Sequence, residues 1–410
     1  MREKLIAEYH RMLTMDESLT GEFIASLKGM MRTRQLLYGE REIGVALRPH
    51  LLTRTQFNLL TTSSEAVAEA CNKVAAVLLA EPWRMEGIGL TEREVQLALV
   101  EPKYAAPAVT SRLDAFVYGD EIKFVEYNAE NPSSLSDPEG LNDVLLEVGA
   151  MRTIAERYQL SQFSPALTLL DALLDTFREW GGVGAPNIAI LDWEGLPTAR
   201  EFVLLQEVFM SRGVQAVICT PGELEYDNGK LHCGAFPIDL VYKRVVIHEF
   251  LARCDNSHPL IQAYMHGDVC LVNNFRCKML HKKATFELLT DAASASWFTP
   301  HEREVIARTV PWTRRVAERK TQHGGQEIDL VPHIRKNRQR FVLKPNDDYG
   351  GRGISIGAHT TAVEWDAALS EALAGDYVVQ EKIELQTEVF PIFGESGWDF
   401  QPMYVDTNPF

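Results

Sequence analysis

The spacing of apolar residues changes along this chain, and the change restricts the folds that it can adopt. Over residues 1–99, apolar residues recur every three or four positions, as in LIAEYHRML and EAVAEACNKVAAVLLAEPW, which predicts helices. Further on, short apolar runs typical of strands alternate with helical patterns. After the glycine-rich stretch at 181–186, the runs NIAILDW and VQAVICT flank a helical segment, which predicts a β-α-β unit with parallel strands. We therefore expect an α/β (α+β) protein with a helical N-terminal region and a small parallel-sheet domain.

Residues 108–132 predict two short strands joined at the turn Gly119-Asp120-Glu121. Side chains two residues apart share one face of a strand. A three-residue turn places Asp114 opposite Glu126. Arg112 then lies opposite Asn128 on the same face. The residues expected on the other face are apolar and suited to packing, namely Leu113, Ala115, Val117, Val125 and Tyr127.

Two carboxylates that face each other across a strand pair repel unless a cation lies between them. The oxygen ligands of Asp, Glu and an Asn carbonyl suit Mg²⁺, whose coordination water and phosphates can complete. The alternative for this segment is an ordinary hairpin with surface charges. A second acid-x-Asn pair near the end of the sequence, Asp406 and Asn408, is an alternative metal-binding pair.

The run FVLKP places Lys344 at the end of a predicted buried strand, directly before a glycine-rich loop. Gly350, Gly351 and Gly353 allow backbone N–H groups to approach an anion closely, while Lys344 supplies a fixed positive charge. This combination indicates a phosphate-binding loop. A plain glycine-rich turn between two strands is the alternative.

Two further segments fit a nucleotide site. The strand-like run VVQEKI carries Gln380 and Glu381 at its end, where they are placed to hydrogen-bond an adenine and a ribose. In FRCKMLHKKATFELL, Lys282 and Lys283 lie in the first part of a predicted helix, from which a lysine could reach a phosphate. A solvated helix face is the alternative for this lysine pair.

The pattern R-x-D, followed by E-Y-N-A-x-x-P-[ST]-S-L, resembles the metal-binding hairpin of the glutathionylspermidine synthetase-like family. Members of this family are ATP-grasp ligases with a permuted domain order. In them the metal hairpin precedes the α/β domain, and the lysine and glycine-loop segments follow it, as here. The resemblance covers residues 111–386, is strongest in the hairpin and in FVLKP, and is thin over residues 1–99.

The resemblance implies an ATP-grasp fold with permuted domain order and a role for each matching residue. Arg112 would stabilise the phosphoryl group during transfer. The implied ligands of Mg²⁺ are Asp114, Glu126 and Asn128. Two Mg²⁺ ions are expected. The implied contacts to the phosphates of ATP are Lys283 and Lys344. The loop NDDYGGRG is longer than the family's short glycine-arginine loop, which leaves the role of Arg352 open.

From these residues we expect an ATP-dependent ligase that phosphorylates a carboxylate and joins the acylphosphate to an amine. The expected partners are small-molecule or peptide carboxylates, including amino acids, and an amine or polyamine. The alternative is a noncatalytic nucleotide-binding protein with a regulatory or partner role.

A chain of 410 residues is too long for one core, so we expect several packed units. The predicted division has four segments. They are a helical N-terminal region at 1–105, the metal-binding hairpin and helices of the ATP-grasp sheet at 106–180, a pre-ATP-grasp-like α/β domain at 185–275, and an ATP-binding region with a glycine-loop lid at 276–410.

Composition disfavours other classes of function. A formal net charge of −16 opposes binding to nucleic acid or to anionic lipid. The sequence contains no apolar run of the roughly 20 residues that span a bilayer, so we expect no membrane partner and a cytoplasmic location. The six cysteines form no C-x-x-C pair, which predicts reduced thiols.

Three further segments bear on the function. The run at 353–357 matches G-x-S-x-G but follows a glycine loop, which disfavours a serine nucleophile. The β-α-β unit after residue 187 lacks G-x-G-x-x-G, so dinucleotide binding is not expected. The run Tyr242-Lys243-Arg244 ends a predicted strand and could bind a substrate carboxylate through the guanidinium fork. A surface salt bridge is the alternative for this run.

Overall fold

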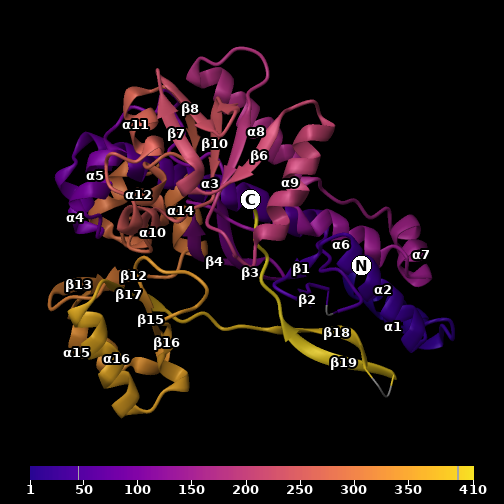
Figure 1. Cartoon of the computed structure of the whole chain (residues 1–410). Coiled ribbons are helices and arrows are strands. Elements are labelled where there is room, and N and C mark those ends of the chain that lie inside the picture. Colours follow the sequence, from indigo (N-terminus) through magenta and orange to yellow (C-terminus); the bar gives the residue numbers. More distant parts are fainter. Residues whose placement is uncertain (45, 395–396) are drawn as a thin grey trace.

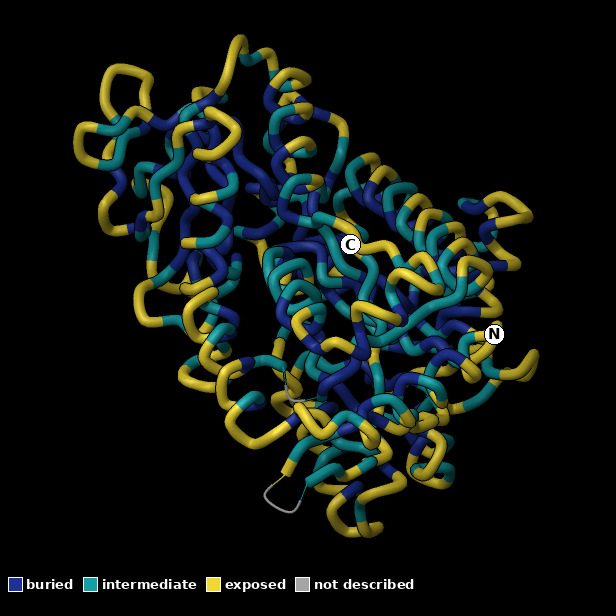
Figure 2. The backbone as a smooth tube through the Cα atoms, turned by 90° about the vertical axis from the view of Figure 1, so that its right-hand side faces the viewer, coloured by how far each residue is buried: buried dark blue, intermediate teal, exposed yellow. Residues whose placement is uncertain are grey.

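The computed structural model describes residues 1–44, 46–394 and 397–410. A larger body of helices around a parallel sheet carries a smaller lobe, drawn in orange and yellow at the lower left of Figure 1. A long yellow hairpin extends from this lobe toward the indigo N-terminal helices. Buried segments run through the interior, whereas the outer loops are exposed (Figure 2).

The first 99 residues are mainly helical, as their spacing predicted. A capping box of Thr53 and Gln56 begins the longest of these helices, α3, whose buried face belongs to a core shared with the β3–β4 hairpin described next. The elements of this part are α1 (Arg2–Met15), α2 (Gly21–Thr33), β1 (Leu37–Tyr38), β2 (Arg41–Glu42), α3 (Arg54–Ala80), α4 (Trp83–Gly87) and α5 (Glu92–Ala98).

An antiparallel hairpin and three helices follow. The hairpin consists of β3 (Arg112–Tyr118) and β4 (Glu121–Asn128), and the helices are α6 (Asp137–Leu145), α7 (Gly149–Tyr158) and α8 (Pro165–Trp180). Helix α8 ends at Gly181, whose left-handed backbone (φ 106°) is a common helix terminator. The glycine-rich stretch at 181–186 therefore begins at a helix end.

The predicted β-α-β unit is confirmed and belongs to a four-stranded parallel sheet in the order β11-β10-β5-β6. All four residues of β5 are buried, because α8 and α9 cover one face of the sheet and α10 and α11 lie toward the other. The elements are β5 (Ile188–Leu191), α9 (Ala199–Ser211), β6 (Ala216–Cys219), β10 (Leu240–Lys243), α10 (Ile247–Arg253), α11 (Pro259–His266) and β11 (Cys270–Val272).

A small antiparallel sheet is inserted between β6 and β10. It is preceded by the 3₁₀ turn η1 (Pro221–Glu223) and contains β7 (Leu224–Asp227), β8 (Lys230–Cys233) and β9 (Phe236–Ile238). Asn228 and Gly229 join β7 to β8, and both have positive φ, which suits a tight hairpin turn.

One helix prediction needs correction. Lys282 and Lys283 lie in a break between α12 (Cys277–His281) and α13 (Thr285–Thr290), because the N–H of Lys283 donates to Asn346 O and not along a helix. The next helix, α14 (Pro300–Thr309), stops before Pro311. The 3₁₀ segment η2 (Ala292–Trp297) precedes α14.

The smaller lobe is an antiparallel sheet in the order β12-β17-β15-β16, with α15 and α16 packed against it. Its strands are β12 (Thr313–Arg315), β15 (Phe341–Pro345), β16 (Ser355–Ile356) and β17 (Tyr377–Glu381), and its helices are α15 (Leu330–Lys336), η3 (Arg338–Arg340), η4 (Gly357–His359) and α16 (Ala362–Ala374). A separate hairpin pairs β13 (Lys320–His323) with β14 (Gln326–Asp329).

The last hairpin pairs β18 (Thr387–Gly394) with β19 (Gly397–Tyr404) and packs against a core to which α1, α2, α6 and α7 contribute. One core joins α3, the β3–β4 hairpin and helices α12 to α14, and it thus contains residues from the first, second and fourth predicted segments. The division into four segments stays a prediction. None of the helices in the described ranges has the length and apolar character needed to cross a membrane.

Candidate active site

The charged face of the β3–β4 hairpin has the predicted pairing. The pairs are Arg112 with Asn128 and Asp114 with Glu126. The predicted turn is one residue too long, because Tyr118 pairs with Glu121 and leaves only Gly119 and Asp120 in the turn. Gly119 adopts φ 59°, which suits a two-residue hairpin turn.

The two-residue turn alone would shift the two strands by one residue relative to each other. A β-bulge compensates for this shift and restores the predicted pairing of the charged residues. The register changes between Asp114 and Ala115, so that Ala115 pairs with Phe124. Phe124 is fully buried, whereas Val125 is half-buried and lines a cavity beside the charged face. The prediction that Val125 packs in the core is therefore wrong, because the bulge turns this residue toward the site.

Two hydrogen-bonded pairs organise this face. Arg112 Nε donates to Asp114 Oδ1 at 2.7 Å, and its Nη1 donates to Ser133 O at 3.1 Å. On the opposite strand, Asn128 Nδ2 donates to Glu126 Oε1 at 3.0 Å. The guanidinium thus lies beside the Asp114 carboxylate, outside the lining of the cavity described below, and its role in phosphoryl transfer stays a prediction.

The final residues of the chain add to the edge of β3. Thr407 forms a bridge with Ala115, and its N–H donates to Ala115 O at 2.7 Å. Asp406 consequently lines the same cavity as Asp114 and Glu126. The two acid-x-Asn pairs that the sequence presented as alternatives therefore contribute carboxylates to one cavity.

Two lysines face these carboxylates from other elements. Lys344, in β15, donates to Gln380 Oε1 at 2.8 Å and to Val125 O at 3.2 Å. Lys283, from the break after α12, has its Nζ 3.4 Å from Glu126 Oε2 and 2.7 Å from Asp348 O. Both lysines line the cavity, so positive and negative side chains meet across it.

The glycine loop borders the same cavity. Gly350 and Gly351 line it, and both have positive φ (67° and 75°). Gly353 has φ 66°, and a Cβ there would lie 2.7 Å from Pro345 Cγ. Arg352 also lines the cavity and lies over the ring of Tyr349. The loop requires glycine at these positions for its conformation and its approach to β15.

Burial and neighbouring charge perturb the ionisation of this face. Burial would raise the pKa of Glu126, but Lys283 and Lys344 outweigh it and lower the pKa to about 2. Burial lowers the pKa of Lys344 to about 8, although Glu126 opposes this shift. The pKa of Asp114 is raised by burial and by repulsion from Glu126, against the effect of Arg112.

Gln380 and Glu381, expected near the adenine, lie in different surroundings. The Gln380 side chain is buried, accepts from Lys344 and donates to Thr313 Oγ1 at 3.0 Å. Glu381 lines a second cavity with Lys382 and Phe116, and Phe116 also lines the first cavity. The two cavities therefore adjoin at Phe116, and the contacts of both predicted residues to a nucleotide stay predictions.

The prediction that the run at the end of β10 binds a substrate carboxylate is wrong. Tyr242, Lys243 and Arg244 are all buried. Arg244 donates to Pro132 O and pairs with Glu201 at 3.3 Å. This guanidinium therefore fastens the segment after the hairpin to the parallel sheet.

The cavity also contains residues that the sequence did not single out. Asp348 and Tyr349 line it from the loop before the glycines, and Phe116 lines it from β3. Asp348 and Tyr349 could have been found from the sequence, because they directly precede the glycines in the loop NDDYGGRG. No sequence pattern distinguished Phe116, because the bulge that follows Asp114 decides how the residues beyond it pair.

The donor set fits the cofactors that the sequence implied. Asp114, Glu126 and Asp406 supply hard carboxylate oxygens on one side of the cavity, and Mg²⁺ prefers such ligands. Asn128 lies next to Glu126 on the same strand face and has a carbonyl oxygen of the same kind. Lys283, Lys344 and the glycine loop provide cationic and N–H groups that suit phosphates.

Comparison with known proteins supports the fold. No family profile matches the sequence, and no curated protein matches it significantly. The structure resembles a glutathione synthetase-like effector (GSS30) from Globodera pallida in its apo form. The TM-score is 0.61 at 14% identity, over 95% of this chain and 87% of that chain.

Two solved ATP-grasp proteins show weaker similarity. One is a RimK domain ATP-grasp protein from Sphaerobacter thermophilus DSM 20745, with a TM-score of 0.28 and 20% identity over 51% of this chain and 69% of that chain. The other is the ATP-grasp ligase PsnB complexed with a minimal precursor, with a TM-score of 0.31 and 12% identity over 54% and 77%. The chain has the mixed α/β architecture of the ATP-grasp fold, as its sequence predicted.

Proposed function

We propose that this chain is an ATP-dependent ligase that joins a carboxylate to an amine. The observation that supports this proposal is one cavity in which carboxylates of the β3–β4 hairpin and the C-terminal run face two lysines and a glycine loop. Phosphoryl transfer requires mainly positioning and the neutralisation of charge, and this arrangement offers both. A serine or cysteine nucleophile is not needed for it.

The proposed reaction has two steps. A substrate carboxylate oxygen attacks the γ-phosphorus of ATP, which forms an acylphosphate and releases ADP. The amine nitrogen then attacks the acyl carbon, phosphate leaves, and the nitrogen loses a proton to give the amide. In this proposal the transferred charge is stabilised by Lys283 and Lys344, which line the cavity, and by Arg112, which donates a hydrogen bond to Asp114 beside it. Mg²⁺, when held by Asp114, Glu126 and Asn128, would neutralise phosphate charge.

The glycine loop is the proposed lid over the phosphates. Its glycines have positive φ, and the loop from Gly350 to Gly353 is exposed on its outer side. An acylphosphate hydrolyses when water reaches it, so closure of the loop would protect the intermediate.

The substrate class in this proposal comes from the resemblance to the glutathionylspermidine synthetase-like family. The glutathionylspermidine synthetase-like pattern favours a peptide or an amino acid as the carboxylate and an amine or polyamine as the acceptor. Similarity to an effector described as glutathione synthetase-like is compatible with a small peptide substrate.

The direct test is ADP release from Mg²⁺-ATP in the presence of pooled amino acids, small peptides and polyamines. We expect release that requires both a carboxylate and an amine, and that is lost in Asp114→Asn and Lys344→Met. Lys320→Met, which removes an exposed lysine of β13, is the matched control and should keep wild-type release.

Nucleotide binding without acceptor-dependent release from any pool would favour the alternative function, a noncatalytic nucleotide-binding protein. Absence of nucleotide binding would contradict both functions.

A further inference from the structure

A buried group of charged side chains lies directly behind the proposed phosphate site. Lys278 Nζ is 2.7 Å from Glu130 Oε1 and 2.6 Å from Asp347 Oδ1. Lys282 Nζ is 2.6 Å from Asp347 Oδ2 and 3.6 Å from Glu94 Oε2. The side chains of Lys278 and Glu130 are fully buried, and that of Asp347 is 14% exposed. We call these five residues the buried charge cluster.

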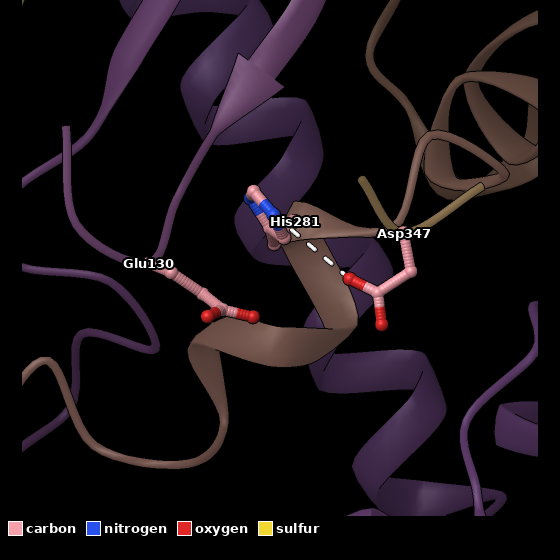
Figure 3. A group of neighbouring side chains, drawn as sticks. All are labelled: Glu130, His281 and Asp347. Carbon is pink, nitrogen blue, oxygen red and sulfur yellow. Dashed lines mark ion pairs between the residues drawn. The ribbon is translucent and has the colours of Figure 1, made fainter. Parts of the chain in front are cut away.

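Three residues in this region have the chemistry of a metal site. Glu130, His281 and Asp347 place one potential ligand atom each within 4.8 Å of one another, and Figure 3 shows them converging from three segments. The ammonium of Lys278, however, lies between Glu130 and Asp347 at ion-pair distance from both. Lys278 therefore takes the position of a metal cation, which disfavours a metal site here.

Neighbouring groups stabilise the ionised forms of Glu130 and Asp347. Burial alone would raise the pKa of Glu130, but Lys278, His281 and Lys243 lower it to about 2. Burial lowers the pKa of His281 to about 4, so this imidazole is neutral near pH 7. The carboxylate of Asp347 is stabilised as an anion by His248 and by both lysines, which keep its pKa well below the usual range.

The cluster is joined to the phosphate site by covalent bonds and hydrogen bonds. Asp347 directly precedes Asp348 and the glycine loop, and Lys282 directly precedes Lys283. These two segments are hydrogen-bonded to each other. The N–H of Lys283 donates to Asn346 O at 3.0 Å, and the N–H of Ala284 donates to Asn346 Oδ1 at 2.8 Å. The cluster thus ties the start of the loop to the segment that carries Lys283.

We infer that Lys278 and Asp347 are positioning residues, which hold the glycine loop and Lys283 in the geometry that binds phosphates. Neither side chain lines the cavity, so their effect would pass through Lys282, Asn346 and the backbone. Removal of one partner leaves a buried charge unpaired, and the loop start would shift to let water reach it. The inference rests on the proposed function for its nucleotide part only.

The first experiment needs no nucleotide. Trypsin cleavage after Arg352, in the exposed loop, reports how often the loop opens. We expect cleavage to accelerate by about tenfold in Lys278→Met and Asp347→Asn, and Lys278→Arg to restore a rate near wild type. Lys73→Met is the control, because it removes the ammonium from a partly buried ion pair, with Glu302 at 2.6 Å, away from the loop.

The second experiment measures nucleotide kinetics of the same variants. We expect KM for Mg²⁺-ATP to rise about 10- to 100-fold with a smaller change in kcat, because misplacement weakens nucleotide binding before chemistry. If Lys278→Met does not fold, Asp347→Asn decides, since it preserves the shape of a partly exposed side chain.

Unchanged cleavage together with unchanged KM would overturn the inference, as would equal effects in Lys73→Met. A wild-type protein that binds no nucleotide would contradict the proposed function instead, and the cleavage rates would still decide whether the cluster positions the loop.

Discussion

At the scale of single residues, Lys344 shows how burial sets the behaviour of a charge in the site. Its pKa is about 8 because burial penalises the ammonium, although Glu126 favours the charged form. Above this pH the Lys344 side chain of the free protein loses its positive charge. In the proposed function, the affinity for nucleotide would therefore depend on a proton that an exposed lysine would keep.

We predict that the affinity of the wild type for Mg²⁺-ATP falls as the pH rises above about 8. Lys344→Arg should lose this pH dependence, because a guanidinium stays charged throughout the range. The measurement is calorimetric titration of the protein with Mg²⁺-ATP at a series of pH values from about 7 to about 9.5. Parallel pH profiles for the two proteins would assign the dependence to another group.

Asp406 is the residue whose place in the site was left open by the sequence. It lines the cavity with Asp114 and Glu126, so it is placed to contribute an oxygen to a bound cation. We predict that Asp406→Asn raises the Mg²⁺ concentration for half-maximal ADP release by about tenfold or more. Asp399→Asn, which changes an exposed carboxylate of β19, is the control. Equal Mg²⁺ dependence in the two variants would exclude Asp406 from cation binding.

At the scale of elements, the glycine loop provides a matched pair of substitutions. Gly351 and Gly353 both have positive φ, but only at Gly353 would an added Cβ approach another residue, at 2.7 Å from Pro345 Cγ. Gly351→Ala meets backbone strain of about 1 kcal/mol, whereas Gly353→Ala meets this strain and a clash with β15.

We predict a larger increase of KM for Mg²⁺-ATP in Gly353→Ala than in Gly351→Ala, by about tenfold. Steady-state kinetics of both variants, with thermal unfolding as a check on folding, makes the comparison. A larger effect at Gly351 would mean that backbone contacts to phosphate, and not the packing of the loop on β15, dominate.

Local sequence patterns predicted the helices and strands well where the contacts that form them are close in sequence. The pairing of the charged residues in the β3–β4 hairpin and the β-α-β unit were both predicted from residue spacing. The bulge after Asp114 and the helix break at Lys283 were not. Both depend on a distant partner, since Ala115 is bonded to Thr407 and Lys283 to Asn346, which lie far along the chain.

At the scale of the whole molecule, the site is assembled from segments that are remote in sequence. The hairpin, the break after α12, the glycine loop and the final residues all line one cavity. Sequence motifs identified most of the charged groups, because phosphate and metal chemistry requires recognisable residue types. They did not predict that Asp406 joins the hairpin or that Arg244 is buried, because these outcomes depend on how the units pack.

The central claim is that a carboxylate is activated by phosphorylation in this cavity. The most direct measurement is transfer of ¹⁸O from a labelled substrate carboxylate to the inorganic phosphate released in the complete reaction. We predict phosphate that carries one ¹⁸O atom with the wild type and none with Lys344→Met. Amide formation with unlabelled phosphate, or ADP release without any amide, would contradict the account.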